Sequence, residues 1–136
     1  MKHASSVRQK NFLHILDTSA LIAYLAEETG ANQVQTIRGS CAIPFIALSE
    51  LYYVTWRKQN QAMADETIQY VSSWDMPLLF PDQRVSLSAG YIKAQHQLGI
   101  ADSYIAALAL EHRATLVTKD SDFQALKHDI KLMFLS

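Results

Sequence analysis

The sequence predicts an α/β fold in which helices cover both faces of a central parallel sheet of four to five strands. Short apolar runs alternate with amphipathic stretches of helical length, and this alternation is typical of parallel sheets. The four glycines and three prolines fall where elements are expected to end. The 136 residues contain no low-complexity linker and no internal repeat, which indicates a single domain.

The first half of the chain contains two expected strands and three expected helices. The apolar run Phe12–Leu16 stops at Asp17 and predicts a strand. Thr18 or Ser19 can then cap a helix that reaches Leu25. The further expected elements are a strand at Cys41–Ile43, an amphipathic helix after Pro44 and a helix over Gln61–Trp74.

The second half repeats the alternation and ends on a strand. Gly99 is expected to end one helix just before the most apolar helix of the chain begins. The expected elements are a strand at Met76–Phe80, helices over Asp82–Leu98 and Asp102–Arg113, a strand at Thr115–Thr118, a short helix over Ser121–Lys127 and a strand at Ile130–Leu135. In parallel sheets of this kind, ligands bind beyond the carboxyl ends of the strands.

Composition narrows the class of protein. Twelve Lys and Arg against 13 Asp and Glu give a formal net charge of −1, which is unlike the basic balance of a free-standing DNA-binding domain. The single cysteine, Cys41, cannot form an internal disulfide, and we expect it to be a small buried apolar residue. No apolar run approaches the roughly 18 residues of a membrane-spanning helix. Residues 1–11 lack the apolar stretch of a signal peptide. We expect a cytoplasmic protein with a flexible extension over 1–11 and a domain over 12–136.

Several acidic residues stand where an ordinary surface acid is not expected. Asp17 ends the first apolar strand, and Asp120 and Asp122 follow the strand TLVT. Glu50 lies within the apolar sequence IALSELYYV, and Asp102 opens the most apolar helix. Buried acids are rare unless they are paired or bound to metal.

Each of these acids also has a structural explanation. Asp120 and Asp122 can cap a loop or helix, and Asp102 can stabilise a helix dipole. Glu50 can lie on a polar stripe with Arg57 and Lys58. Capping does not require Asp17, because the two hydroxyl residues that follow it can do the same.

Taken together, the strand-end acids and the helix acids can face one crevice. Gathered carboxylates repel one another and raise each other's pKa unless a cation neutralises them. Hard divalent ions such as Mg²⁺ take oxygen ligands, and such sites support phosphoryl chemistry. The sequence therefore favours a divalent-metal site.

Four segments, in order along the chain, carry a family resemblance. They are LDTSALIAYL (16–25), IPFIALSELYYV (43–54), LGIADSYIAALAL (98–110) and TLVTKDSDF (115–123). These segments resemble the motifs of PIN-domain ribonucleases, and most closely those of VapC-type toxins from bacterial toxin–antitoxin pairs. The resemblance runs from about Phe12 to the C-terminus. It implies a three-layer α/β/α PIN-like fold.

The resemblance also implies an activity, partners and residue roles. The expected activity is Mg²⁺- or Mn²⁺-dependent endoribonuclease hydrolysis of RNA phosphodiester bonds. The expected partners are RNA, a cognate antitoxin protein and a second copy of the chain in a homodimer, with no membrane. By motif position, the catalytic acids are Asp17, Glu50, Asp102 and Asp120, the metal ligands are Asp17, Asp102, Asp120 and Asp122, and the supporting hydroxyls are Thr18, Ser19 and Thr118.

Two further expectations concern residues outside the motif acids. The aromatic residues Tyr52, Tyr53 and Trp56 are expected in the core or in a protein interface rather than against RNA bases. Any of Arg84, Lys93, Arg113, Lys119 and Lys127 can meet RNA phosphates.

The alternative function is a catalytically inactive PIN-like module that binds protein or RNA, but such a module would normally have lost one or more of the motif carboxylates.

Overall fold

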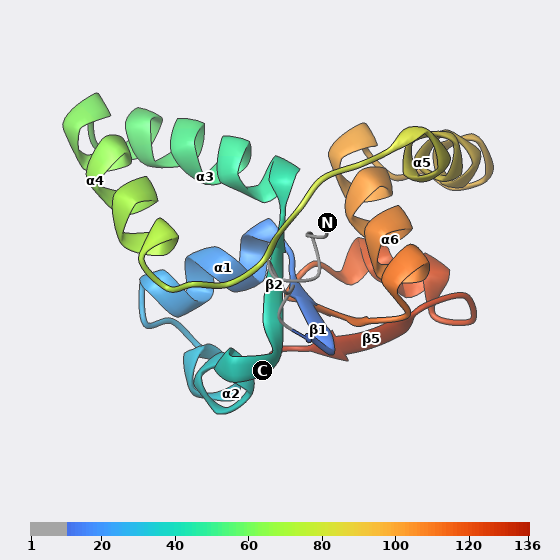
Figure 1. Cartoon of the computed structure of the whole chain (residues 1–136), viewed down its shortest axis with the longest axis horizontal. Helices are drawn as coiled ribbons and strands as arrows, with labels where there is room; N and C mark the ends of the chain where they lie inside the picture. Colours follow the sequence, from blue (N-terminus) through green and yellow to red (C-terminus); the bar gives the residue numbers. More distant parts are fainter. Residues whose placement is uncertain (1–10) are drawn as a thin grey trace, which may run out of the picture.

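The structure is a computed structural model that describes residues 11–136 (Figure 1). Its centre is a five-stranded sheet in the order β3-β2-β1-β4-β5, with every neighbouring pair parallel. This confirms the predicted fold class. The boundary expected between an extension over 1–11 and a domain over 12–136 stays a prediction, because residues 1–10 lie outside the described part. The strands are β1 (His14–Leu16), β2 (Cys41–Pro44), β3 (Leu78–Leu79), β4 (Thr115–Thr118) and β5 (Lys131–Phe134).

Helices connect the strands and form the two outer layers. The α-helices are α1 (Thr18–Leu25), α2 (Ala31–Ile37), α3 (Phe45–Lys58), α4 (Gln61–Ser72), α5 (Gln83–Gln95) and α6 (Ile100–His112), and two 3₁₀ helices are η1 (Arg38–Ser40) and η2 (Ser121–Leu126). Most expected elements are present with ends displaced by a few residues.

Adjacent residues of the central strands point to opposite faces of the sheet, as the two-residue period of a strand requires. Ile15 and Leu116 are fully buried in the core that includes α5 and α6. Their neighbours Leu16 and Val117 are fully buried in a second core that includes α1 and α2. Helices therefore cover both faces, and α1 with α2 lies on the other side of the sheet from α5 with α6 (Figure 1). Each such buried aliphatic side chain contributes about 1.5–3 kcal/mol.

The strand order creates a crevice between the carboxyl ends of β1 and β4. From β1 the chain builds outward through β2 to β3, and then crosses back to place β4 on the other side of β1. Ligands bind at such a reversal of strand order. Leu16 pairs with Val117, and the Asp17 N–H donates to the Val117 carbonyl at 3.1 Å. Thr118, the residue after Val117 in β4, therefore lies beside Asp17.

Two local expectations were wrong or incomplete. Helix α2 and the 3₁₀ turn after it were not predicted, because only Val34 of α2 is buried and its remaining residues give no apolar stripe. Gly30 begins α2 at φ +100°, and a Cβ there would lie 2.7 Å from the Cβ of Leu135. Gly99 does not end a helix: α5 stops at Gln95, and Gly99 is the N-cap of α6.

Cys41 is buried, as predicted, and burial raises its thiol pKa to about 12. Tyr53 and Trp56 are each 45% exposed, so the core explanation is wrong for them and the interface explanation stays a prediction. No helix in residues 11–136 has the length and apolarity needed to cross a membrane.

Candidate active site

Asp17 is the most constrained acid of the crevice. Its side chain is 3% exposed. Oδ1 accepts hydrogen bonds from the Ser19 hydroxyl at 2.7 Å and from the Ala20 N–H at 2.8 Å. Oδ2 accepts a hydrogen bond from the Thr118 hydroxyl at 2.5 Å. Asp17 itself is thus the N-cap of α1, so the expectation that Thr18 or Ser19 caps this helix was wrong. Burial raises the pKa of Asp17 and these donors oppose that rise.

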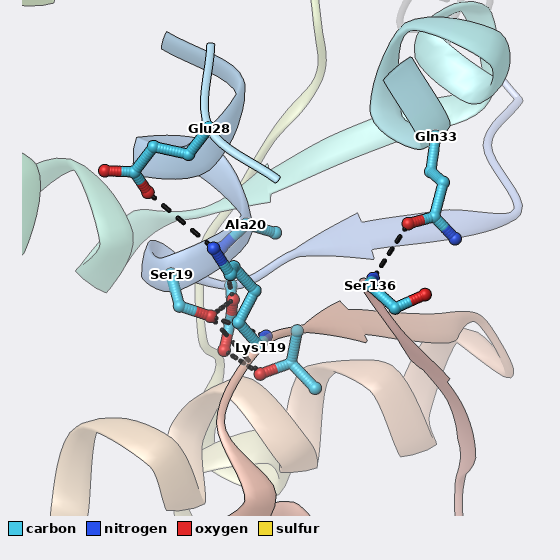
Figure 2. A network of polar contacts seen from close by, with 8 residues as sticks. Ser19, Ala20, Glu28, Gln33, Lys119 and Ser136 are labelled. Carbon is cyan, nitrogen blue, oxygen red and sulfur yellow. Dashed lines mark hydrogen bonds and ion pairs between the residues drawn. The ribbon is translucent and has the colours of Figure 1, made fainter. Parts of the chain in front are cut away.

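Hydroxyl groups tie the loop after β4 to Asp17. The buried Thr118 hydroxyl, which donates to Asp17, also accepts a hydrogen bond from the Asp120 N–H at 2.9 Å. The Ser19 hydroxyl accepts one from the Lys119 N–H at 2.8 Å (Figure 2). The predicted supporting residues Ser19 and Thr118 therefore link the two central strand ends.

Asp120 and Asp122 differ in their placement. The Asp120 carboxylate caps η2 by accepting a hydrogen bond from the Asp122 N–H at 2.9 Å. Asp120 is half-buried and its charge raises the pKa of Asp17, whereas Asp122 is exposed. Of these two acids, Asp120 is therefore the one whose charge acts on Asp17.

Glu50 faces the start of α1 rather than a polar stripe along its own helix. The Thr18 hydroxyl donates to Glu50 Oε1 at 2.5 Å. The Arg57 guanidinium instead lies over the Tyr53 ring, 5.2 Å from its centroid. No ion pair found among residues 11–136 includes Glu50. The polar-stripe explanation is therefore wrong for Glu50, and Thr18 joins it to the crevice.

The pKa of Asp102 is affected by the charges of the other carboxylates in the crevice. It lies in the first turn of α6 and is half-buried. Burial is the main cause that raises its pKa to about 6, and the charges of Asp120, Asp17, Glu50 and Asp122 add to it in that order. Among the described residues, neither a hydrogen-bond donor nor a cation is directed at the Asp102 side chain. The other three motif acids and Asp122 are therefore close enough to Asp102 for their charges to act on it.

The chemistry of these donors fits a hard divalent cation, although no ready-made cage is present. Within residues 11–136, no three acidic, histidine or cysteine side chains are grouped closely enough to hold a metal ion where they stand. All donors are carboxylate oxygens, and within the described part of the chain Asp102 has no hydrogen-bond donor or cation beside it. Mg²⁺ is usually bound by one or two carboxylates and several waters, so a closed protein cage is not required.

One contact next to the crevice was not foreseen from the sequence. The Lys119 ammonium lies 3.7 Å from Glu28 Oε1 (Figure 2). These residues are 91 positions apart in the chain, and Glu28 follows α1 without belonging to any motif. No periodic pattern in the sequence signals such a pair.

The chain is similar to known proteins in its match to a family model and in its fold. The PIN-domain family model matches residues 14–129. Among curated proteins, none matches this chain. Chains of three solved structures share its fold at 18–24% identity. For VapBC2 from Rickettsia felis bound to a fragment of promoter DNA, the TM-score is 0.74 at 19% identity, with 90% of this chain and 98% of that chain covered. For DNA-bound VapBC from Salmonella typhimurium, it is 0.75 at 18%, covering 90% and 97%. For VapBC-1 from nontypeable Haemophilus influenzae, it is 0.69 at 24%, covering 89% and 96%. Since the family model spans most of the sequence, this chain belongs to the PIN-domain family.

Proposed function

We propose that this chain is a Mg²⁺- or Mn²⁺-dependent endoribonuclease that hydrolyses RNA phosphodiester bonds and acts as the VapC-type toxin of a toxin–antitoxin pair. The observation that carries the proposal is that four other carboxylates lie near enough to the half-buried Asp102 for their charges to add to the effect of burial in raising its pKa. A stable fold has no need to gather five negative charges without a partner. A divalent cation is the partner that such oxygen donors prefer.

The roles of the residues follow from how each is held. Both carboxylate oxygens of Asp17 are fixed by hydrogen bonds, so its direction toward the crevice is set before any ligand arrives. Asp17, Asp102 and Asp120 would hold the cation, with Asp122 at the exposed rim. When bound, Mg²⁺ lowers the pKa of water and stabilises negative charge on a leaving oxygen.

Glu50 is suited to orient the attacking water. Its Oε1 is occupied by the Thr18 hydroxyl at 2.5 Å, and the orientation of the carboxylate is thereby fixed. Among residues 11–136 no donor is directed at its other oxygen, which would accept a hydrogen bond from the attacking water. A group that accepts this proton must lie within hydrogen-bond reach of the water, which makes Glu50 the proposed positioning acid.

The proposed partners are a cognate antitoxin and a second copy of this chain. A further structure that shares the fold, VapBC-5 from Mycobacterium tuberculosis, is named as a member of the VapBC family of toxin–antitoxin systems, and we propose an antitoxin partner for this chain as well. A groove of about 500 Å³ between α1, α3 and α4 is lined by Ile22, Leu51, Val54 and Tyr70 among others. Grooves of this kind accept an amphipathic helix. Co-expression of the product of a small neighbouring gene is expected to restore growth to cells that this chain inhibits. Light scattering of the purified chain tests whether it forms a dimer.

RNA cleavage by the purified chain tests the function. Wild-type protein with Mg²⁺ is expected to cut single-stranded RNA and leave 5′-phosphate and 3′-hydroxyl ends, with no cleavage in EDTA. Asp17→Asn and Asp102→Asn are expected to lose at least a hundredfold in rate. Asp129→Asn, an exposed acid in the turn before β5, is the matched control and keeps full activity.

Two results would count against the proposal. Undiminished metal-dependent cleavage by both variants would remove these acids from the reaction. A folded wild-type chain that binds RNA or protein but cuts no RNA with Mg²⁺ or Mn²⁺ would support the inactive interaction module instead. Asp102→Asn leaves the buried Asp17 network intact, so loss of activity there is not explained by loss of fold.

A further inference from the structure

We propose that the Lys119 ammonium binds an RNA phosphate next to the scissile one, and that Glu28 occupies this cation until RNA displaces it. This inference rests on the proposed ribonuclease function and assigns a substrate-binding residue to it. It also predicts that the two partners of one ion pair affect RNA binding in opposite directions.

The main chain of Lys119 is anchored in the catalytic network. Its N–H donates to the Ser19 hydroxyl at 2.8 Å, and that hydroxyl donates to Asp17 Oδ1 at 2.7 Å. Lys119 also lies between Thr118 and Asp120 in sequence. Its side chain therefore starts two hydrogen bonds away from the Asp17 carboxylate.

The ion pair directs the ammonium away from the carboxylates. Asp17 caps the N-terminal end of α1, whereas Glu28 follows the C-terminal end of the same helix. The Lys119 ammonium lies 3.7 Å from Glu28 Oε1, so it is held on the flank of the crevice. A cation at this place does not neutralise Asp17, but it can meet a phosphate on the strand that runs through the crevice.

A crevice with five carboxylates needs such a cation to admit a polyanion. Phosphate contacts by Lys and Arg supply most sequence-independent affinity for nucleic acids. Two other candidate cations already have partners. The Arg84 guanidinium pairs with Glu111 at 3.0 Å, and the Lys93 ammonium donates to the Leu98 carbonyl at 2.9 Å. Lys119 is the candidate cation that hydrogen bonds connect to Asp17.

The pair with Glu28 is easily exchanged for a phosphate. The Lys119 side chain is 32% exposed and the Glu28 side chain 51% exposed. Ion pairs with this exposure contribute little stability. Phosphate offers the same charge-assisted contact, so RNA can replace Glu28 without disturbing the fold.

RNA binding in a cleavage-deficient background tests the inference. A fluorescein-labelled single-stranded RNA is titrated against Asp102→Asn protein with Mg²⁺, and anisotropy is measured over a series of salt concentrations. Adding Lys119→Gln is expected to weaken binding about five- to tenfold. The slope of log affinity against log salt should fall by about 0.7, the value for one single-strand phosphate contact. Lys131→Gln changes an exposed lysine at the amino end of β5, at the sheet edge opposite to the crevice; it is the matched control and changes neither quantity.

Glu28→Gln separates substrate binding from a structural ion pair. Freeing the ammonium is expected to strengthen RNA binding two- to fivefold, and the Glu28→Gln/Lys119→Gln double variant should bind like Lys119→Gln alone. In the cleavage-competent chain, Lys119→Gln should raise KM with kcat unchanged. Each variant should unfold at the same temperature as the chain into which its change is introduced, Asp102→Asn in the binding assay and wild type in the cleavage assay.

The outcomes distinguish this inference from the function on which it rests. If Lys119→Gln leaves the affinity and the salt slope unchanged while the wild-type chain cuts RNA, the inference is overturned and the proposed ribonuclease function stands. Weakened binding in Glu28→Gln, equal to that in Lys119→Gln, would assign the pair a structural role and also overturn it. Absence of both RNA binding and cleavage in the parent chain would overturn the function and the inference together.

Discussion

Replacing Asp102 by asparagine should abolish activity and yet stabilise the metal-free protein. The pKa of Asp102 is about 6 against an ordinary value of 3.8, and each pKa unit corresponds to about 1.4 kcal/mol. The full difference of about 3 kcal/mol must be roughly halved because the carboxylate is partly exposed to solvent. Loss of the favourable first-turn helix-dipole interaction removes about another 0.5 kcal/mol. The expected net gain is about 1 kcal/mol at pH 7.5.

Thermal unfolding in EDTA measures this gain. For a chain of this length, about 1 kcal/mol raises Tm by about 3–4 °C. Asp129→Asn, the exposed control, should stay within about 0.5 kcal/mol of wild type. Millimolar Mg²⁺ should then raise the Tm of wild type more than that of Asp102→Asn, because a ligand stabilises only the state that binds it. A lower Tm for Asp102→Asn in EDTA would refute the claim that crowded carboxylates destabilise this crevice.

Three further results are expected from the same geometry. Because the folded chain holds the Asp102 proton more tightly than the unfolded chain does, the contribution of Asp102 to stability in EDTA should fall as pH rises from about 4 to about 6; urea unfolding of wild type and Asp102→Asn should show this difference, and parallel pH curves would contradict it. Thr118→Val should cost about 1–3 kcal/mol in urea unfolding, because Asp17 loses a buried donor; an unchanged midpoint would contradict that network. Gly30→Ala should destabilise by more than about 1 kcal/mol, since Gly30 has φ +100° and a Cβ there meets another Cβ at 2.7 Å. Gly90→Ala, in open space within α5, should instead gain about 0.5–1 kcal/mol, and equal effects of the two changes would refute the steric argument.

The alternation of strands and helices was predictable because buried strands and amphipathic helices leave different apolar periods. Helix α2 was not, because it buries only Val34 and leaves no apolar stripe. The strand order was also out of reach, since each apolar run shows a strand without showing its neighbours. That order is what sets β4 beside β1 and Thr118 beside Asp17.

The candidate acids were found by position and by family resemblance, but their contacts were not. Asp17 caps α1 and is held by hydroxyls at the same time, so capping and a place in the crevice are not alternatives for this residue. The choice between a polar stripe and the crevice for Glu50 depended on Thr18, which lies 32 residues away in sequence. Only the folded chain brings such pairs together.

Binding of Mn²⁺ by the RNA-free protein tests the central claim most directly. Titration of Mn²⁺ followed by calorimetry or by its electron paramagnetic resonance signal gives the affinity without any substrate. Wild type should bind the ion at neutral pH, and the affinity should fall at least tenfold in Asp102→Asn but not in Asp129→Asn. Equal binding by wild type and Asp102→Asn, or no binding by wild type, would contradict the account of this crevice as a divalent-metal site.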